Sequence, residues 1–274
     1  MNSDMPIGVF DSGVGGLSVL RAIRKKLPNE SVLYFADQVH VPYGPRPLEE
    51  VRGYSDSITR FLLGRGAKLI VVACNAASAA ALHTLRQTFP KVFFVGMEPA
   101  VKPAVEITHT GVVGVLATPA TFQGALYASV VERFASNVTI LQSVCPGLVQ
   151  QIERGELDTR KTRQILEAAL NPMLERGIDT VVLGCTHYPF VIPLIQAIVG
   201  PDVRVIDPAP AVARQVERLL DTGSGLRLES PVERSGLLSF FTSGEVAQFK
   251  FMLPRFLGEE GEVRHVDWVG NVIN

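Results

Sequence analysis

The chain lacks an excess of charge of either sign. Its 274 residues include 26 Lys and Arg and 27 Asp and Glu, which gives a formal net charge of −1. Nucleic acids and anionic membrane surfaces are bound through a basic excess or a basic patch, and neither is visible here. We therefore expect no nucleic-acid partner and no membrane partner.

Long hydrophobic runs are also missing, and cysteines are few. Apolar stretches such as 68–82 are interrupted by polar residues and are shorter than the roughly 20 residues that cross a membrane. The N-terminus, MNSDMPIGVF, shows no basic segment followed by an apolar one, so we expect no secretion signal. The three cysteines, Cys74, Cys145 and Cys185, are odd in number and far apart. Such spacing argues against a disulfide framework and favours a reducing, cytoplasmic location.

What the sequence does contain is a regular alternation of short apolar runs with longer amphipathic segments. The short runs are rich in Val, Ile and Leu and lie at 6–10, 31–35, 68–73, 92–95, 111–116, 138–142, 179–183 and 203–206. Helix-length segments include 48–64, 76–88, 122–134, 159–176 and 209–220. This alternation predicts an α/β fold with mainly parallel sheets flanked by helices.

The alternation is repeated within the chain. IGVFDS at 7–12 matches VGVLAT at 113–118, and VVACN at 71–75 matches VLGCT at 182–186. VFFVGMEPAV at 92–101 likewise matches VRVIDPAPAV at 203–212. The two members of each pair are therefore separated by a similar number of residues along the chain. We interpret this as one α/β unit used twice. The fold class that we predict is two pseudo-symmetric α/β domains that face each other.

Cys74 and Cys185 occupy matching places in the two units, each after an apolar strand and before a helix. In a parallel α/β unit, ligands bind at this end of the strands. A helix N-terminus also favours a thiolate by lowering the pKa of the thiol. A single cysteine here is readily explained as a small buried hydrophobe. The matched pair instead predicts two sulfurs that approach one ligand from opposite sides, whereas Cys145 is interpreted as structural.

Other polar residues follow the same strands. Asp11 and Ser12 precede the turn GVGG, which is not a dinucleotide fingerprint because Ser18 stands at the third glycine position. His187 lies two residues after Cys185, but a closed zinc site needs four ligands, so we expect no metal and favour proton transfer. Hydroxyl and amide side chains that suit carboxylate binding, or ordinary helix capping, are Ser12, Asn75, Thr118, Thr121 and Thr186.

Two opposed thiols suit the inversion of a carbon centre by proton transfer. One sulfur, as thiolate, removes the α-proton of an amino acid, and the other, as thiol, returns a proton from the opposite face. The reverse reaction exchanges these roles. On this hypothesis Asp11 assists near Cys74, and His187 assists near Cys185.

Five segments, in order, resemble bacterial glutamate racemases of the aspartate/glutamate racemase superfamily: GVFDSGVGGLSVL, HVPYG, VVACNAASA, GLVQQIERGEL and LGCTHYP. With the FFTSGEVAQFKFMLPRFLG segment, the resemblance extends from residue 7 to 258. It implies conversion of L-glutamate to D-glutamate for peptidoglycan, and hence for cell-wall synthesis and cell shape. The resemblance further implies no pyridoxal phosphate, no metal, a cytoplasmic enzyme and commonly a homodimer.

The resemblance also implies roles for individual residues. Cys74 and Cys185 become the acid/base catalysts, Asp11 and His187 their auxiliary groups, and Glu153 a further carboxylate near the second thiol. The implied substrate-binding residues are Asp11, Ser12, Tyr43, Gly44, Asn75, Ala76, Thr118, Thr121, Thr186 and His187. Ala76 departs from the family pattern, which has threonine there. Its backbone N–H could still bind a carboxylate, and the lost hydroxyl is expected to weaken binding by about 1 kcal/mol.

The implied domains are discontinuous: residues 1–98 plus 209–274 form one, residues 99–208 form the other, and the active site lies between them.

Three other functions remain open. The first is a racemase for aspartate or a related amino acid, and the second is a non-catalytic amino-acid-binding protein. The third is a thiol oxidoreductase, although no C-x-x-C motif occurs.

Overall fold

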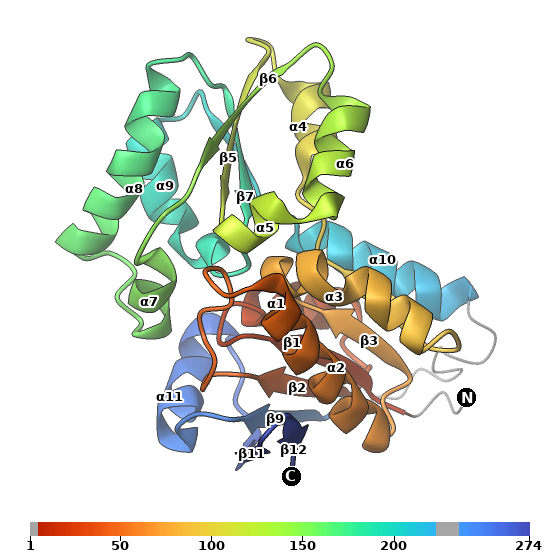
Figure 1. Cartoon of the computed structure of the whole chain (residues 1–274). Helices are drawn as coiled ribbons and strands as arrows, with labels where there is room; N and C mark the ends of the chain where they lie inside the picture. The colour runs from red at the N-terminus through yellow and green to blue at the C-terminus, as the bar shows by residue number, and fades with distance from the viewer. Residues whose placement is uncertain (1–4, 223–235) are drawn as a thin grey trace.

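The computed structural model describes residues 5–222 and 236–274, and two parallel sheets dominate it (Figure 1). One sheet has six strands in the order β10-β9-β2-β1-β3-β4, and the other has four in the order β6-β5-β7-β8. Every neighbouring pair within these two sheets is parallel. Helices cover both faces of each sheet, which confirms the predicted fold class.

The six-stranded sheet is built from both ends of the chain. Its strands are β1 (Ile7–Asp11), β2 (Val32–Ala36), β3 (Leu69–Val72), β4 (Phe93–Gly96), β9 (Leu238–Thr242) and β10 (Glu262–His265). The helices around it are α1 (Leu17–Lys26), α2 (Leu48–Gly64), α3 (Asn75–Thr88), α10 (Ala209–Thr222) and α11 (Val246–Phe256). A small antiparallel hairpin, β11 (Trp268–Val269) and β12 (Val272–Ile273), lies near the C-terminus.

The four-stranded sheet is built from the middle of the chain. Its strands are β5 (Val112–Ala117), β6 (Thr139–Ser143), β7 (Thr180–Gly184) and β8 (Arg204–Ile206). The accompanying α-helices are α4 (Val101–Ile107), α5 (Pro119–Gln123), α6 (Ala125–Phe134), α7 (Leu148–Glu153), α8 (Arg160–Leu174) and α9 (Ile192–Val199), and a 3-10 helix, η1, covers Tyr188–Val191.

The repeat seen in the sequence is also present in the topology. The strands β2-β1-β3-β4 have the same order as β6-β5-β7-β8, so β1 corresponds to β5 and β3 to β7. Every residue of β1, β3 and β7 is buried, as expected for strands with helices on both faces. The chain passes between the sheets twice, after β4 and after β8.

One helix boundary differs from the prediction. The single helix expected over 122–134 is two helices, α5 and α6, separated at Gly124. The backbone of Gly124 is extended, with ψ of 136°, which interrupts the helix. A Cβ on Gly124 would lie 2.6 Å from the Cβ of Ala79, so this glycine also permits the close approach of α3. Within the two described ranges, no helix is long and apolar enough to cross a membrane.

A buried ion pair lies at the edge of the six-stranded sheet where its strands begin. Nζ of Lys68, just before β3, is 2.6 Å from Oε2 of Glu30, just before β2, and both side chains are buried. Removing one partner of a buried pair leaves the other charge uncompensated, at a cost of roughly 3–5 kcal/mol. Replacing both partners by apolar residues avoids that cost.

We therefore predict that Lys68→Met lowers the free energy of unfolding by about 3 kcal/mol, as measured by urea denaturation. The double variant Lys68→Met/Glu30→Leu should recover most of that loss. Equal destabilisation of the single and the double variant would contradict this explanation.

Candidate active site

The carboxyl ends of β1, β3 and β7 converge on one small cavity of about 20 Å³. Cys74 directly precedes α3, and Cys185 directly follows β7, so the two thiols reach the cavity from different sheets. Both are buried. The lining residues are Ser12, Pro42, Tyr43, Gly44, Cys74, Asn75, Ala76, Thr118, Val149, Cys185, Thr186 and His187.

Most residues expected at the site from the sequence are in this lining. Three are not part of it, namely Asp11, Glu153 and Thr121. Asp11 and Glu153 contact lining residues directly, as described below. Thr121 lies 3.2 Å from Thr118, measured between the two hydroxyl oxygens, and donates to the carbonyl of Gly184 at 3.5 Å. Thr121 therefore supports Thr118 and the end of β7 and does not face the cavity.

The environment of Cys74 corrects one expectation. Burial and the nearby Asp11 carboxylate raise the pKa of the Cys74 thiol well above its usual value, and the N–H of Ala77 in the first turn of α3 only partly opposes them. The position at a helix N-terminus was expected to favour the thiolate. Here desolvation raises the pKa of the thiol by more than the helix N-terminus lowers it, so Cys74 rests as a thiol.

Asp11 is held by the turn that follows β1. Its Oδ2 accepts hydrogen bonds from the backbone N–H groups of Gly13 and Gly16, each at 3.0 Å, and its Oδ1 accepts one from the Thr186 hydroxyl at 3.3 Å. Burial raises the pKa of Asp11, whereas the charge of His187 and the two N–H groups oppose this rise. Asp11 is thus a buried carboxyl that contacts both halves of the site.

On the Cys185 side of the cavity, His187 lies between Cys185 and Glu153 and contacts both. The Sγ of Cys185 is 3.8 Å from Nδ1 of His187, and Nε2 of His187 is 2.6 Å from Oε1 of Glu153. Burial lowers the pKa of His187, but the hydrogen bonds to Cys185 and Glu153 outweigh it, so the pKa lies well above its usual value. His187 therefore rests as an imidazolium paired with Glu153.

The glycine turn accommodates this pair. A Cβ on Gly13 would lie 2.0 Å from Oε1 of Glu153, and a Cβ on Gly15 would lie 2.3 Å from Nδ1 of His187. In addition, the N–H of Val14 donates to Oε1 of Glu153 at 2.8 Å. These glycines therefore allow the Glu153–His187 pair to approach the backbone of the turn.

Two residues at the site were missed in the sequence. Gln38 donates from Nε2 to Oε2 of Glu153 at 3.2 Å, and its Oε1 accepts from the hydroxyl of Thr242 at 2.8 Å. Asp37, fully buried beside it, accepts from the hydroxyl of Tyr43 at 2.6 Å. Both follow β2, so the rule that polar residues after strands line a site could have identified them.

Asn75 supplies polar atoms without a protein partner. Its side chain is buried at the cavity, and within the part of the chain that the structure describes neither its Oδ1 nor its Nδ2 has a hydrogen-bond partner. Buried polar atoms of this kind are rare unless a ligand or water satisfies them. The backbone N–H groups in the first turn of α3, which include that of Ala76, also lack intrahelical acceptors. The lining contains no Lys or Arg.

Cys145 lies near the site without lining this cavity. It is buried, and burial raises the pKa of its thiol to about 12. It borders an adjacent cavity of about 220 Å³ together with Tyr188.

Among residues 5–222 and 236–274, no three His, Cys, Asp or Glu side chains are grouped as ligands for a metal ion.

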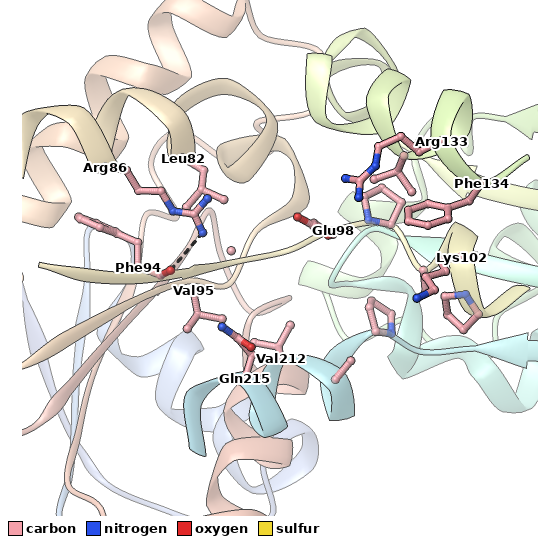
Figure 2. A pocket seen from close by; sticks show the side chains of 17 residues that line it. Leu82, Arg86, Phe94, Val95, Glu98, Lys102, Arg133, Phe134, Val212 and Gln215 are labelled. Atoms are coloured by element: carbon pink, nitrogen blue, oxygen red, sulfur yellow. Dashed lines mark hydrogen bonds between the residues drawn. The ribbon is translucent and has the colours of Figure 1, made fainter. Parts of the chain in front are cut away.

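A larger cavity, of about 500 Å³, lies where the chain passes between the two sheets (Figure 2). Arg86, Lys102 and Arg133 are among its lining residues, and Nη2 of Arg86 donates to the carbonyl of Phe94 at 3.3 Å. This cavity shares no residue with the lining around Cys74 and Cys185. The smaller cavity is the candidate active site because the thiols and the buried acid/base groups are there.

Comparisons with known proteins show which family the chain resembles. The family model described as Asp/Glu/hydantoin racemase matches residues 7–216. The glutamate racemase of Pseudomonas aeruginosa PAO1 is 55% identical over 257 residues, which is 94% of this chain and 96% of that protein. The glutamate racemase of Ectopseudomonas mendocina is 49% identical over 261 residues, which is 95% of this chain and 98% of that protein.

Solved structures show the same relationship. A glutamate racemase isoform from Bacillus anthracis gives a TM-score of 0.86 at 32% identity and covers 99% of this chain and 100% of that one. The structure of the Francisella tularensis glutamate racemase in complex with D-glutamate gives a TM-score of 0.83 at 27% identity, and the match covers 98% of this chain and 98% of that one. The chain therefore belongs to the Asp/Glu/hydantoin racemase family and is an isomerase.

Proposed function

We propose that the protein interconverts L-glutamate and D-glutamate without a cofactor, with Cys74 and Cys185 as the two acid/base catalysts. The observation that carries this proposal is the pair of buried thiols, from matching places after β3 and β7, that line one cavity. The names of the relatives support glutamate as the substrate. In this role the enzyme supplies D-glutamate for peptidoglycan in the cytoplasm, and the family resemblance extends the proposal to a homodimer.

The reaction consists of two proton transfers. In one direction the Cys74 thiolate takes the α-proton and becomes a thiol, while the Cys185 thiol gives its proton to the opposite face of the carbanion and becomes a thiolate. The reverse reaction starts from the opposite protonation states. Each turnover thus exchanges the states of the two sulfurs, and the protons must be redistributed before the next one.

The groups behind each sulfur suit this redistribution. Because burial and Asp11 hold Cys74 as a thiol, Asp11 is the nearby base that can take its proton, and the substrate ammonium stabilises the resulting thiolate. On the other side, a His187 imidazolium held by Glu153 stabilises the Cys185 thiolate and can return a proton to it.

Substrate recognition relies on neutral donors. The side chain of Asn75 and the N–H groups at the start of α3 are available to the substrate carboxylates, and the hydroxyl of Thr118 lines the cavity beside them. Such preorganised donors also stabilise the charge that develops when the α-proton leaves. Ala76 contributes through its backbone only.

Access requires movement. A cavity of about 20 Å³ holds little more than one water molecule, so glutamate enters only when the surrounding walls separate. We infer that residues 1–98 plus 209–274 and residues 99–208 act as two domains, which is supported by the two chain crossings after β4 and after β8. Residues 1–4 and 223–235 of the first domain lie outside the described residues.

The two-thiol assignment predicts that Cys74→Ala and Cys185→Ala each lower the rate of racemisation by about 10²- to 10⁴-fold, which is the typical contribution of general acid–base catalysis. The rate is measured by circular dichroism starting from each enantiomer. Cys145→Ala, the control with a third buried thiol, should keep near-original turnover. Near-original turnover in either of the first two variants would refute the assignment.

The Glu153–His187 pair predicts a change in pH dependence. Because the hydrogen bond to Glu153 helps to raise the pKa of His187, Glu153→Gln should lower that pKa. Activity that needs protonated His187 is present below this pKa and lost above it, so the alkaline limb of kcat should move to lower pH, and the maximum of kcat should fall. A pH–rate profile measures both effects, and an unchanged alkaline limb would remove His187 from proton transfer.

A further inference from the structure

We propose that Trp268 is a positioning residue for the active site, acting through the buried carboxylate of Asp37 on Tyr43. The proposal rests on the proposed racemisation and concerns residues 38–46, which we call the active-site loop. This loop contributes Pro42, Tyr43 and Gly44 to the cavity lining. Trp268 is distant in sequence and belongs to the C-terminal hairpin.

Asp37 joins three separate segments of the chain. It is fully buried, and its Oδ2 accepts from the Tyr43 hydroxyl at 2.6 Å while Nδ1 of His40 lies 2.9 Å away. Its Oδ1 accepts from the indole N–H of Trp268 at 2.8 Å and from the hydroxyl of Ser243 at 2.9 Å. One carboxylate therefore connects the active-site loop with the end of β9 and with the hairpin.

The hydroxyl of Tyr43 is directed at this carboxylate and not at the cavity. Burial and the interaction with Asp37 raise the pKa of Tyr43 well above its usual value, so the phenol keeps its proton and remains a donor. The position of the Tyr43 ring beside the cavity is thus set by Asp37. The next residue, Gly44, accepts from the N–H of Ala120 in α5 at 3.0 Å, so the loop also contacts the other half of the site.

The Trp268 ring packs against two aromatic side chains next to Asp37. Its ring meets His40 edge-on, with centroids 5.0 Å apart, and meets Tyr54 of α2 in the same way at 5.5 Å. His40 in turn stacks on Tyr54 at 3.9 Å. The indole therefore contributes both aromatic packing and a hydrogen-bond donor, and the two contributions can be separated by mutation.

The test is a double-mutant cycle. Trp268→Phe retains an aromatic ring but removes the donor to Asp37 together with part of the indole surface, so we expect kcat to fall about 5- to 10-fold while KM changes less, on the scale of one ordinary hydrogen bond. Tyr43→Phe removes the same connection at its other end. If Trp268 acts through Asp37 and Tyr43, then Trp268→Phe in the Tyr43→Phe background should produce little further loss.

Independent, multiplicative losses in the cycle would overturn the proposal, as would an unchanged kcat in Trp268→Phe. Val272→Ala, in the same hairpin with an exposed side chain, is the matched control and should leave kcat and KM unchanged. Thermal unfolding checks that each variant is folded. If Trp268→Phe does not fold, Ser243→Ala replaces it in the cycle, because it also removes one donor to Oδ1 of Asp37.

A spectroscopic measurement gives a second, independent outcome. Trp268 is the only tryptophan of the chain, so its fluorescence reports this position alone. Titration of the unaltered protein with D-glutamate should change the emission, and the change should be diminished in Tyr43→Phe at saturating ligand. Emission that is insensitive to ligand would contradict the coupling. An unaltered protein that fails to racemise glutamate would refute the proposed function instead, since the parent activity is measured first.

Discussion

The contact between the Glu153–His187 pair and the turn after β1 is the interaction on which the active site depends. Glu153 lies at the end of α7, yet two of its hydrogen-bond donors, the N–H of Val14 and the amide of Gln38, come from the other sheet's connections. Glycines at 13 and 15 make this approach possible. Separation of the two proposed domains would remove both donors from Glu153, so the Glu153–His187 pair keeps all of these partners only when the site is closed.

The two halves of the site are alike in fold and opposite in charge. Cys74 has a buried carboxyl beside it, whereas Cys185 has an imidazolium. Two identical environments would favour the same protonation state for both sulfurs, but an inversion needs one thiolate and one thiol at any moment. In the proposed mechanism, the repeat supplies two thiols that reach one cavity from different sheets, and the difference between Asp11 and His187 gives them different proton-transfer partners.

Much of this arrangement could be predicted from local patterns. The eight strands β1–β8 and the placement of both cysteines follow from apolar periodicity and from the repeat. Strand β9 pairs with β2 across about 200 residues, and no local pattern determines such a pairing. The raised pKa of Cys74 was also missed, because burial arises from tertiary packing and outweighs the helix N-terminus. Gln38 and Asp37 were missed although both follow a predicted strand.

In the proposed mechanism, two protein thiols exchange the α-proton of glutamate with solvent during inversion. Proton NMR of the metal-free protein with L-glutamate in deuterated water, without pyridoxal phosphate, detects this exchange. We expect loss of the α-proton signal together with formation of D-glutamate. Exchange and inversion seen only with aspartate would change the substrate and keep the mechanism. No exchange with either acid would refute the two-thiol mechanism and favour an amino-acid-binding protein.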